Sequence, residues 1–464
     1  MDATTAQLVG WAAGMTRDQL TESARHAAKR SLVDSVGCAY GAWREPAMAA
    51  LRELAAGSGA VAPATVLGDR VRTTPELAAF VNGSMIRYLD FSDDYFGGAG
   101  TIGPHPSDNV GGILAAAEST HAGGLDVLLG MTVAYEVVGQ VVDHVRLPSG
   151  RRHWDYTTLH AMGTSLGAGR VLGLEPDALG HALGIATVAN LSLQQSRFGT
   201  ISDWKGLAGP DASSRGLSAA RLAGHGITGP DEPFDGRSGL HALLGTELSL
   251  GELGGAGTPF RIEGTFFKRL PVRYNAQTPI WAAVELGEQL RERGLGPEDV
   301  TRLRVDLVSR YVTTREESPQ SWDPQTPGTA DHSFGYLVAA ALVDGEVTRR
   351  TLTPERFRDP VILRLLDRVE LRADPEFTTA FPATLRSRVT AELVGGERVS
   401  VEHADPKGTP ANPLTDDELG QKFLEQATAV LPGARAREIL DRLWDVDQLH
   451  DVAELMPRLE VVSG

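Results

Sequence analysis

Up to about residue 260 the chain consists of apolar segments of helical length, separated by short stretches rich in Gly, Pro and Asp. Residues 23–40, 110–122 and 124–142 show the apolar spacing of helices. Several segments are rich in Ala and Gly, which favours close approach of neighbouring helices. The pattern predicts a mainly helical first domain, residues 1–265.

From residue 301 the pattern changes to alternation of β-branched and charged residues. Strand-like runs occupy residues 301–310, 367–374 and 386–403, and a Gly-Gly turn divides the last run. Helical segments at 278–293 and 334–343 lie between these runs. The mixture predicts an α+β domain over residues 266–404 rather than a β-sandwich.

The last part of the chain, residues 405–464, is predicted to be helical again. Thr415 is placed as an N-cap, and acidic residues follow it in the first turn. We expect this tail to pack on the first domain. The fold class is therefore mainly α with α+β: an all-helical domain built from both termini, plus an inserted α+β domain.

Composition narrows the possible partners. With 464 residues, 42% of them apolar, the chain is long enough for two cores. Its net charge of −16 disfavours nucleic acid and anionic lipid, and we expect no apolar stretch of bilayer length. One cysteine, Cys38, excludes an internal disulfide and agrees with a cytoplasmic location. No Walker loop, GxGxxG after a strand or metal-ligand spacing occurs, so no cofactor and no metal are expected.

Nine segments, spread over most of the chain and in the same order, resemble those of the MmgE/PrpD family, the 2-methylcitrate dehydratases and their relatives. They are LVDSVGCAYGA, NGSMIRYLDFSDD, HPSDNVGGILAAAE, AYEVVGQ, SDWKGLAGPDASSRGLSAARLA, GITGP, FFKRLPVRYNAQTPIWAAVEL, WDPQTPGTADHSFGYLVAAALVDGEVT and PKGTPANPLTDDELGQKF. The resemblance implies that the α+β domain is a lid, that the protein is a homodimer, and that the active site lies in the cleft between the domains. It also implies a small carboxylate as substrate.

Removing water or CO2 from such an acid without a metal requires a base, an acid and cations that hold the carboxylates. Asp90 and His105 are joined by a glycine-rich loop and are predicted to form an acid/base pair. The alternative is that Asp90 caps a helix end and that His105 is a surface residue.

Cations could come from several positions. Lys205 is a lone lysine in a largely uncharged run, and either reaches solvent or binds an anion. The resemblance places it in the active site. Lys268 and Arg273 lie where the second domain begins, and could bind substrate or simply face solvent near a hinge.

The segment ADHSFGYLVAAAL carries His332 and Tyr336, four residues apart and so on one helical face. The resemblance gives Tyr336 a catalytic role on the lid side. His332 could bind substrate, or could be a hydrogen-bonded histidine near a helix N-terminus.

The chain also departs from the family pattern. Tyr156, with His153 and His160 nearby, stands where relatives carry an active-site histidine, Asn275 replaces another, and Asp94 replaces a threonine. All three are predicted to contact substrate. Fewer cations and an added carboxylate suit a substrate with fewer carboxylates than 2-methylcitrate.

The prediction is a cofactor-free lyase of the dehydratase type acting on a small carboxylate, in which Asp90, His105, Lys205 and Tyr336 are catalytic. One alternative keeps the fold and changes the reaction to decarboxylation, or to epimerisation of an amino- or imino-dicarboxylate. A second alternative is a divergent, non-catalytic binding protein.

Overall fold

The computed structural model describes residues 1–59, 63–97, 103–145, 154–409 and 411–461. These residues form two compact units. The helical unit comprises Met1–Gln195, Gly206–Phe267 and Leu414–Gly464, and the α+β unit comprises Ser196–Lys205 and Lys268–Pro413. The mainly α fold with an α+β part, predicted from the sequence, is confirmed.

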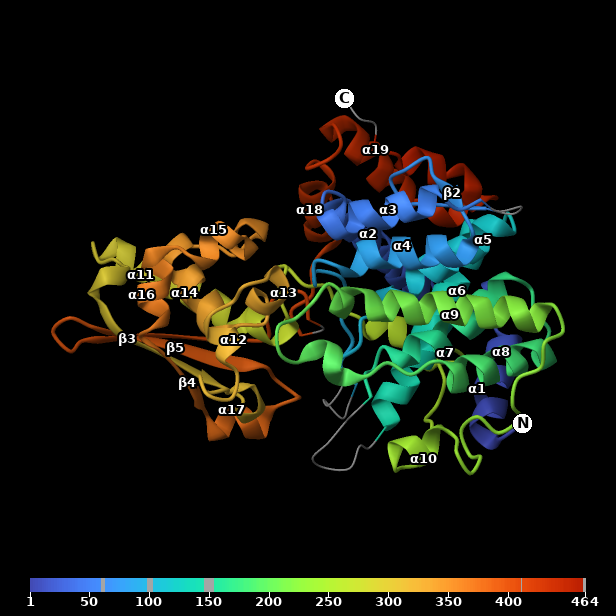
Figure 1. The fold of residues 1–464 in the computed structure, drawn as a ribbon, viewed down its shortest axis with the longest axis horizontal. Helices are drawn as coiled ribbons and strands as arrows, with labels where there is room; N and C mark the ends of the chain where they lie inside the picture. The colour runs from blue at the N-terminus through green and yellow to red at the C-terminus, as the bar shows by residue number, and fades with distance from the viewer. Residues whose placement is uncertain (60–62, 98–102, 146–153, 410, 462–464) are drawn as a thin grey trace. The chain divides into compact units, whose positions relative to one another are not determined.

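The helices α1 to α10 and the last two, α18 and α19, account for most of the helical unit (Figure 1). Their bounds are α1 Ala3–Gly14, α2 Glu22–Ala42, α3 Pro46–Ala56, α4 Pro75–Arg87, α5 Val110–Ser119, α6 Gly124–His144, α7 Thr158–Val171, α8 Pro176–Ala189, α9 Trp204–Gly224, α10 Leu240–Leu244, α18 Asp416–Ala427 and α19 Gly433–Trp444. Two short strands, β1 Ala64–Thr65 and β2 Arg72–Thr73, pair antiparallel beside them.

Helices α6 and α7 pack closely at the centre of this unit. A Cβ atom on Gly167 of α7 would lie 2.4 Å from the carbonyl oxygen of Gly130 on α6, so only glycine permits this approach. The predicted role of glycine in helix packing is confirmed here. Helix α6 is also apolar and long enough to cross a membrane, which corrects the expectation that no stretch has that length. In the most apolar part of α6, 89% of the helix is buried inside the unit, as is typical of a core helix.

The chain's last helices pack on its first ones. Thr415 caps α18, as predicted, by accepting a hydrogen bond from the Glu418 backbone N–H. On the buried face of α18, Lys422 Nζ donates to Asp34 Oδ1 of α2 at 2.6 Å and to the Phe91 carbonyl oxygen at 2.8 Å. This lysine therefore connects α18 to α2 and to the loop that follows α4.

The α+β unit contains a four-stranded sheet of order β4-β3-β5-β6. Strands β3 Val300–Leu307 and β4 Val369–Ala373 run parallel, whereas β5 Arg386–Leu393 is antiparallel to both β3 and β6 Arg398–Ala404. Gly395 and Gly396 adopt positive φ in the turn that joins β5 to β6, as the sequence predicts.

Helices cover one face of this sheet, and buried and partly exposed side chains alternate along β5. Helix α11 packs on β5 and β6, and α14 packs on α11 and α16 and contacts β4 (Figure 1). The helices of the unit are α11 Gln277–Glu292, α12 Pro319–Trp322, α13 Pro327–Ala330, α14 Phe334–Asp344, α15 Pro354–Phe357, α16 Pro360–Leu366 and α17 Pro375–Ala380.

Candidate active site

His105 is held with a defined proton arrangement in the helical unit. It is 4% exposed and lies at the start of a 3-10 turn before α5. Its Nδ1 lies 2.6 Å from the carbonyl oxygen of Asp93. Because a carbonyl oxygen only accepts hydrogen bonds, Nδ1 carries the hydrogen, and the lone pair of the neutral ring is on Nε2. Nε2 lies 3.7 Å from Asp90 Oδ1, so the acid/base pair expected from the sequence is brought together.

Asp90 is positioned by backbone strain and by a neighbouring arginine. It is buried three residues beyond the end of α4, and its φ of 50° places it in the left-handed region, where aspartate is better tolerated than most residues. Arg87, in the last turn of α4, places Nη1 3.1 Å from Asp90 Oδ1. The guanidinium therefore pairs with the carboxylate that lies beside His105.

A second carboxylate and imidazole extend this group. Arg87 Nε lies 3.9 Å from Asp108 Oδ1, and His160 Nε2 lies 3.3 Å from Asp108 Oδ2. The side-chain amide of Asn109 donates to Pro106 O and faces His160 Nδ1 at 3.1 Å, so Nδ1 accepts and the His160 proton is on Nε2, facing Asp108.

The result is a buried row of five charged or titratable side chains: imidazole, carboxylate, guanidinium, carboxylate, imidazole. In order they are His105, Asp90, Arg87, Asp108 and His160. Space beside the row is tight, since a Cβ atom on Gly209 of α9 would lie 1.9 Å from Asp108 Oδ2.

Asp93 connects this row to the core. Its carbonyl oxygen accepts from His105, while its carboxyl accepts from the Ser107 N–H at 3.1 Å and from the Tyr135 hydroxyl at 2.9 Å. Burial raises the pKa of this carboxyl to about 6, and the nearby Asp34 adds to the increase, against the lowering effect of these hydrogen bonds.

Two further predicted residues belong to the helical unit. The ring of Tyr156 is 6.2 Å from that of His105 and 6.3 Å from that of His160, so it contacts both imidazoles. Asp94 is buried, pairs its backbone with Phe266, and accepts the Tyr95 N–H at 3.0 Å through Oδ1. His153 lies outside the described residues.

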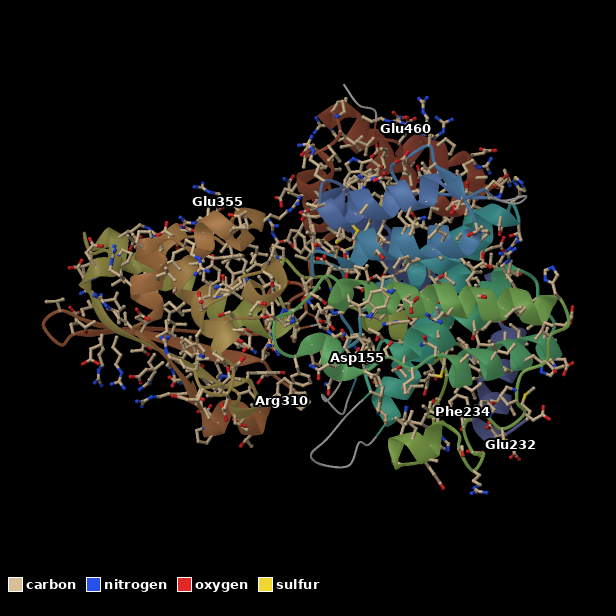
Figure 2. The ribbon with its side chains drawn as sticks, in the orientation of Figure 1. Asp155, Glu232, Phe234, Arg310, Glu355 and Glu460 are labelled. Atoms are coloured by element: carbon tan, nitrogen blue, oxygen red, sulfur yellow. The ribbon has the colours of Figure 1, made fainter. Side chains whose placement is uncertain are left out.

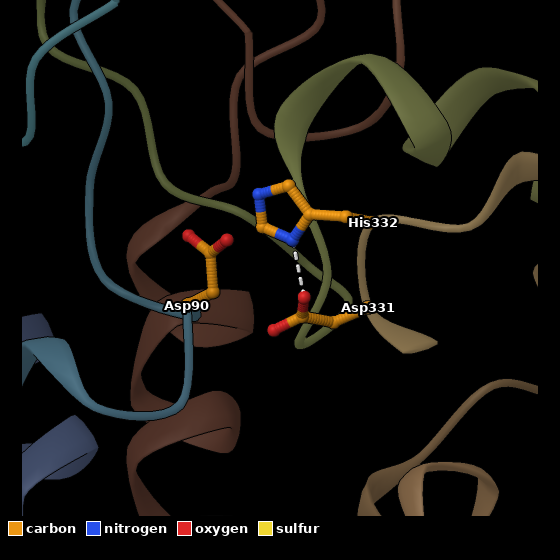
Figure 3. A group of neighbouring side chains, drawn as sticks. All are labelled: Asp90, Asp331 and His332. Atoms are coloured by element: carbon orange, nitrogen blue, oxygen red, sulfur yellow. Dashed lines mark hydrogen bonds and ion pairs between the residues drawn. The ribbon is translucent and has the colours of Figure 1, made fainter. Parts of the chain in front are cut away.

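Lys205 and His332 share one carboxylate in the α+β unit. His332 Nδ1 and the Asp331 carboxylate are hydrogen-bonded (Figure 3), and Lys205 Nζ lies 4.0 Å from Asp331 Oδ2. Lys205 and Asp331 are buried, and His332 is partly exposed. This arrangement places two cationic or potentially cationic groups around one carboxylate.

The other predicted residues of this unit lie in different surroundings. Tyr336 is fully buried, and its hydroxyl donates to the Thr351 carbonyl oxygen at 2.6 Å. Lys268 and Asn275 are buried as well, and Arg273 donates its backbone N–H to the Asp331 carbonyl oxygen. The catalytic role of Tyr336 and the substrate contacts of Lys268 and Asn275 stay predictions.

Sequence reasoning did not single out Arg87, Asp93 or Asp108. All three stand in the segments NGSMIRYLDFSDD and HPSDNVGGILAAAE, which carry the family resemblance, and Arg87 is three residues before Asp90 in the chain. That closeness to a candidate catalytic carboxylate was a usable signal for Arg87. Asp108 and His160 meet only through tertiary packing.

Comparison with known proteins agrees with this architecture. The MmgE/PrpD N-terminal domain matches residues 6–251, and the MmgE/PrpD C-terminal domain matches residues 270–446. The chain is 28% identical over 402 residues to a 2-methylcitrate dehydratase of Salmonella typhimurium, covering 79% of this chain and 78% of that one. It is 25% identical over 459 residues to the cis-aconitate decarboxylase of Homo sapiens, covering 96% and 92%. The chain belongs to the MmgE/PrpD family.

Proposed function

We propose that the protein is a lyase that acts on a small carboxylic acid by acid/base chemistry, with dehydration as the reaction. The observation that carries this proposal is the fixed tautomer of His105. Its hydrogen bond to the Asp93 carbonyl oxygen leaves the Nε2 lone pair beside the Asp90 carboxylate. The 2-methylcitrate dehydratase relatives support the reaction type.

In the proposed reaction, His105 Nε2 takes a proton from the carbon next to a substrate carboxylate. The imidazolium formed is stabilised by the Asp90 carboxylate, which is paired with Arg87. The hydroxyl on the neighbouring carbon leaves with a proton from an acid, so one water and one C=C bond are produced. We assign anion binding to Lys205 and His332.

The substrate is proposed to carry fewer carboxylates than 2-methylcitrate. Tyr156, which is neutral, contacts both His105 and His160, and Asn275 is also neutral. Replacing an imidazolium by a neutral group removes a charge-assisted hydrogen bond, which is typically worth about 1.5 to 3 kcal/mol. Turnover of 2-methylcitrate at ordinary enzyme efficiency would contradict this part of the proposal.

The second candidate is decarboxylation. The relatives that act on cis-aconitate align with nearly the whole chain, 96% of it for the human enzyme and 98% for that of Mus musculus. A base at His105 is not needed to break a C–CO2 bond, but a protonated His105 could return the proton to the resulting carbanion.

The test is proton NMR in D2O with a panel of citrate-like, malate-like and aspartate-like acids. Loss of water supports the lead proposal, loss of CO2 supports decarboxylation, and deuterium uptake without net loss indicates epimerisation. His105→Gln should abolish the reaction, whereas His225→Gln, at an exposed histidine in the turn after α9, should leave it unchanged. Equal activity of the two variants would exclude His105 as the base, and silence of the wild type across the panel would favour a non-catalytic relative.

A further inference from the structure

A small pocket lies within the α+β unit. Its volume is about 200 Å³, below the range of roughly 300 to 1,000 Å³ typical of drug-sized ligands. The segments that line it include the 3-10 turn Ser309–Tyr311 after β3, the start of α14, and residues 197–201. A short organic acid fits within this space.

The charged groups of this pocket are of one sign. Arg197, Arg273 and Arg310 line it together with His332, and no Asp or Glu is among the described residues that line it. Figure 2 labels Arg310, which follows the end of β3. The chain as a whole carries a net charge of −16, so three guanidinium groups at one pocket run against its overall composition. Such a group attracts a small anion.

Aromatic rings fix the direction of two of these arginines. The Arg273 guanidinium lies 5.1 Å from the centre of the Phe334 ring and 5.7 Å from that of Tyr311. Arg310 lies 5.6 Å from the Tyr311 ring. The rings of Tyr311 and Phe334 are themselves stacked, with centres 6.0 Å apart. A stacked guanidinium loses less rotamer freedom when it binds a carboxylate, which favours affinity.

The pocket is connected to the group formed by Lys205, Asp331 and His332. His332 lines the pocket and is hydrogen-bonded to Asp331, beside which Lys205 lies. The short segment that ends at Lys205 is fastened within the same unit, since the Ile201 N–H donates to Thr329 Oγ1 and its carbonyl oxygen accepts from Thr326. Arg197 and Lys205 therefore lie on one short segment, and hydrogen bonds made by Ile201 hold that segment to Thr326 and Thr329.

We propose that this pocket binds a small organic dicarboxylate or tricarboxylate, with its carboxylates on Arg197, Arg273 and Arg310 and its carbon skeleton against Tyr311 and Phe334. The guanidinium fork matches a carboxylate through two parallel N–H···O bonds, and the stacked rings supply the apolar wall. A dicarboxylate in this pocket is either the enzyme's own substrate, which rests on the proposed function, or a separate acid that modulates it, whereas a tricarboxylate is a modulator, because the substrate is proposed to carry fewer than three carboxylates.

Isothermal titration of the full-length protein tests this directly. Succinate and tricarballylate are the probes, and succinamide is the neutral control ligand. Arg310→Gln removes one guanidinium group from the pocket, at an exposed position. Arg398→Gln, at the first residue of β6 with 66% of its side chain accessible, is the matched control variant.

We expect at least one acid to bind wild type and Arg398→Gln equally, and Arg310→Gln to raise its Kd by about tenfold or more. Binding should weaken with salt, less steeply in Arg310→Gln. Arg310→Lys should give an intermediate Kd because it keeps the charge and loses the fork. Equal Kd for wild type and Arg310→Gln, binding of succinamide as tight as that of succinate, or no saturable binding of either acid to wild type would overturn the proposal.

Turnover then distinguishes the two sources of the acid, and the binding result stands even if no reaction is found. If the pocket holds the substrate, Arg310→Gln raises KM and the probes inhibit competitively. If it holds a modulator, the variant keeps the wild-type KM and loses only the response to the probes.

Discussion

The buried carboxyl of Asp93 allows the electrostatics of the helical unit to be tested without knowing the substrate. Its pKa is raised, mainly by burial, from 3.8 to about 6. Between these two values the folded protein binds the proton and the unfolded chain does not. Stability therefore falls as the pH rises from about 4 to about 6, and this contribution is constant above that range. The pKa difference corresponds to about 3 kcal/mol of unfolding free energy.

Asp93→Asn removes the titration while keeping the local hydrogen bonds. The amide oxygen can accept the Ser107 N–H, and the amide nitrogen can donate to the Tyr135 hydroxyl oxygen. Relative to wild type, the variant should gain about 3 kcal/mol between pH 4 and pH 7. With about 2 °C in Tm for each kcal/mol in a large domain, the gap between the two proteins should change by about 6 °C.

Calorimetric melting of both proteins at closely spaced pH values measures this gap. Asp18→Asn, at an exposed position of the same unit, is the control and should follow wild type at every pH. A difference, Tm of Asp93→Asn minus Tm of wild type, that stays constant with pH, or that falls as the pH rises, would refute the reasoning.

Three further changes have defined outcomes. Lys205→Ala should mainly raise KM with a smaller effect on kcat, because Lys205 is proposed to bind a carboxylate; steady-state kinetics would show an equal fall in kcat instead if the lysine transfers the proton. Lys422→Met leaves the buried Asp34 carboxylate without its ammonium and should cost about 3 to 5 kcal/mol, measured by urea unfolding. Gly209→Ala places a methyl group 1.9 Å from Asp108 Oδ2 and should lower kcat even where circular dichroism remains native, whereas full activity would mean that Asp108 does not contribute.

The elements with a clear sequence period could be predicted. Strand β3, the glycine turn after β5 and the Thr415 cap all occur where the pattern places them, because each depends on local backbone preferences. Helix α6 could not be classified from its sequence, since length and apolarity do not distinguish a core helix from a membrane span.

The candidate site was only partly accessible from the sequence. Asp90 and His105 are close in the chain, and His105 Nε2 lies 3.7 Å from Asp90 Oδ1. Asp108 and His160 are about fifty residues apart and meet through the packing of the 3-10 turn Pro106–Asn109 against α7, which no local pattern encodes. The direction of a side chain is also decided by packing, as the hydrogen bond from the Tyr336 hydroxyl to Thr351 illustrates.

The connection made by Lys422 has a consequence for how the protein is synthesised. This lysine is made 331 residues after Phe91, whose carbonyl oxygen it holds next to Asp90. At about 5 to 20 residues per second, a ribosome needs roughly 17 to 66 s to cover that distance. The entire α+β unit emerges during this interval, before the loop carrying Asp90 receives its lysine. Under the proposed function, a chain that ends before α18 should be inert even though both carboxylates and both imidazoles of the buried row have been made.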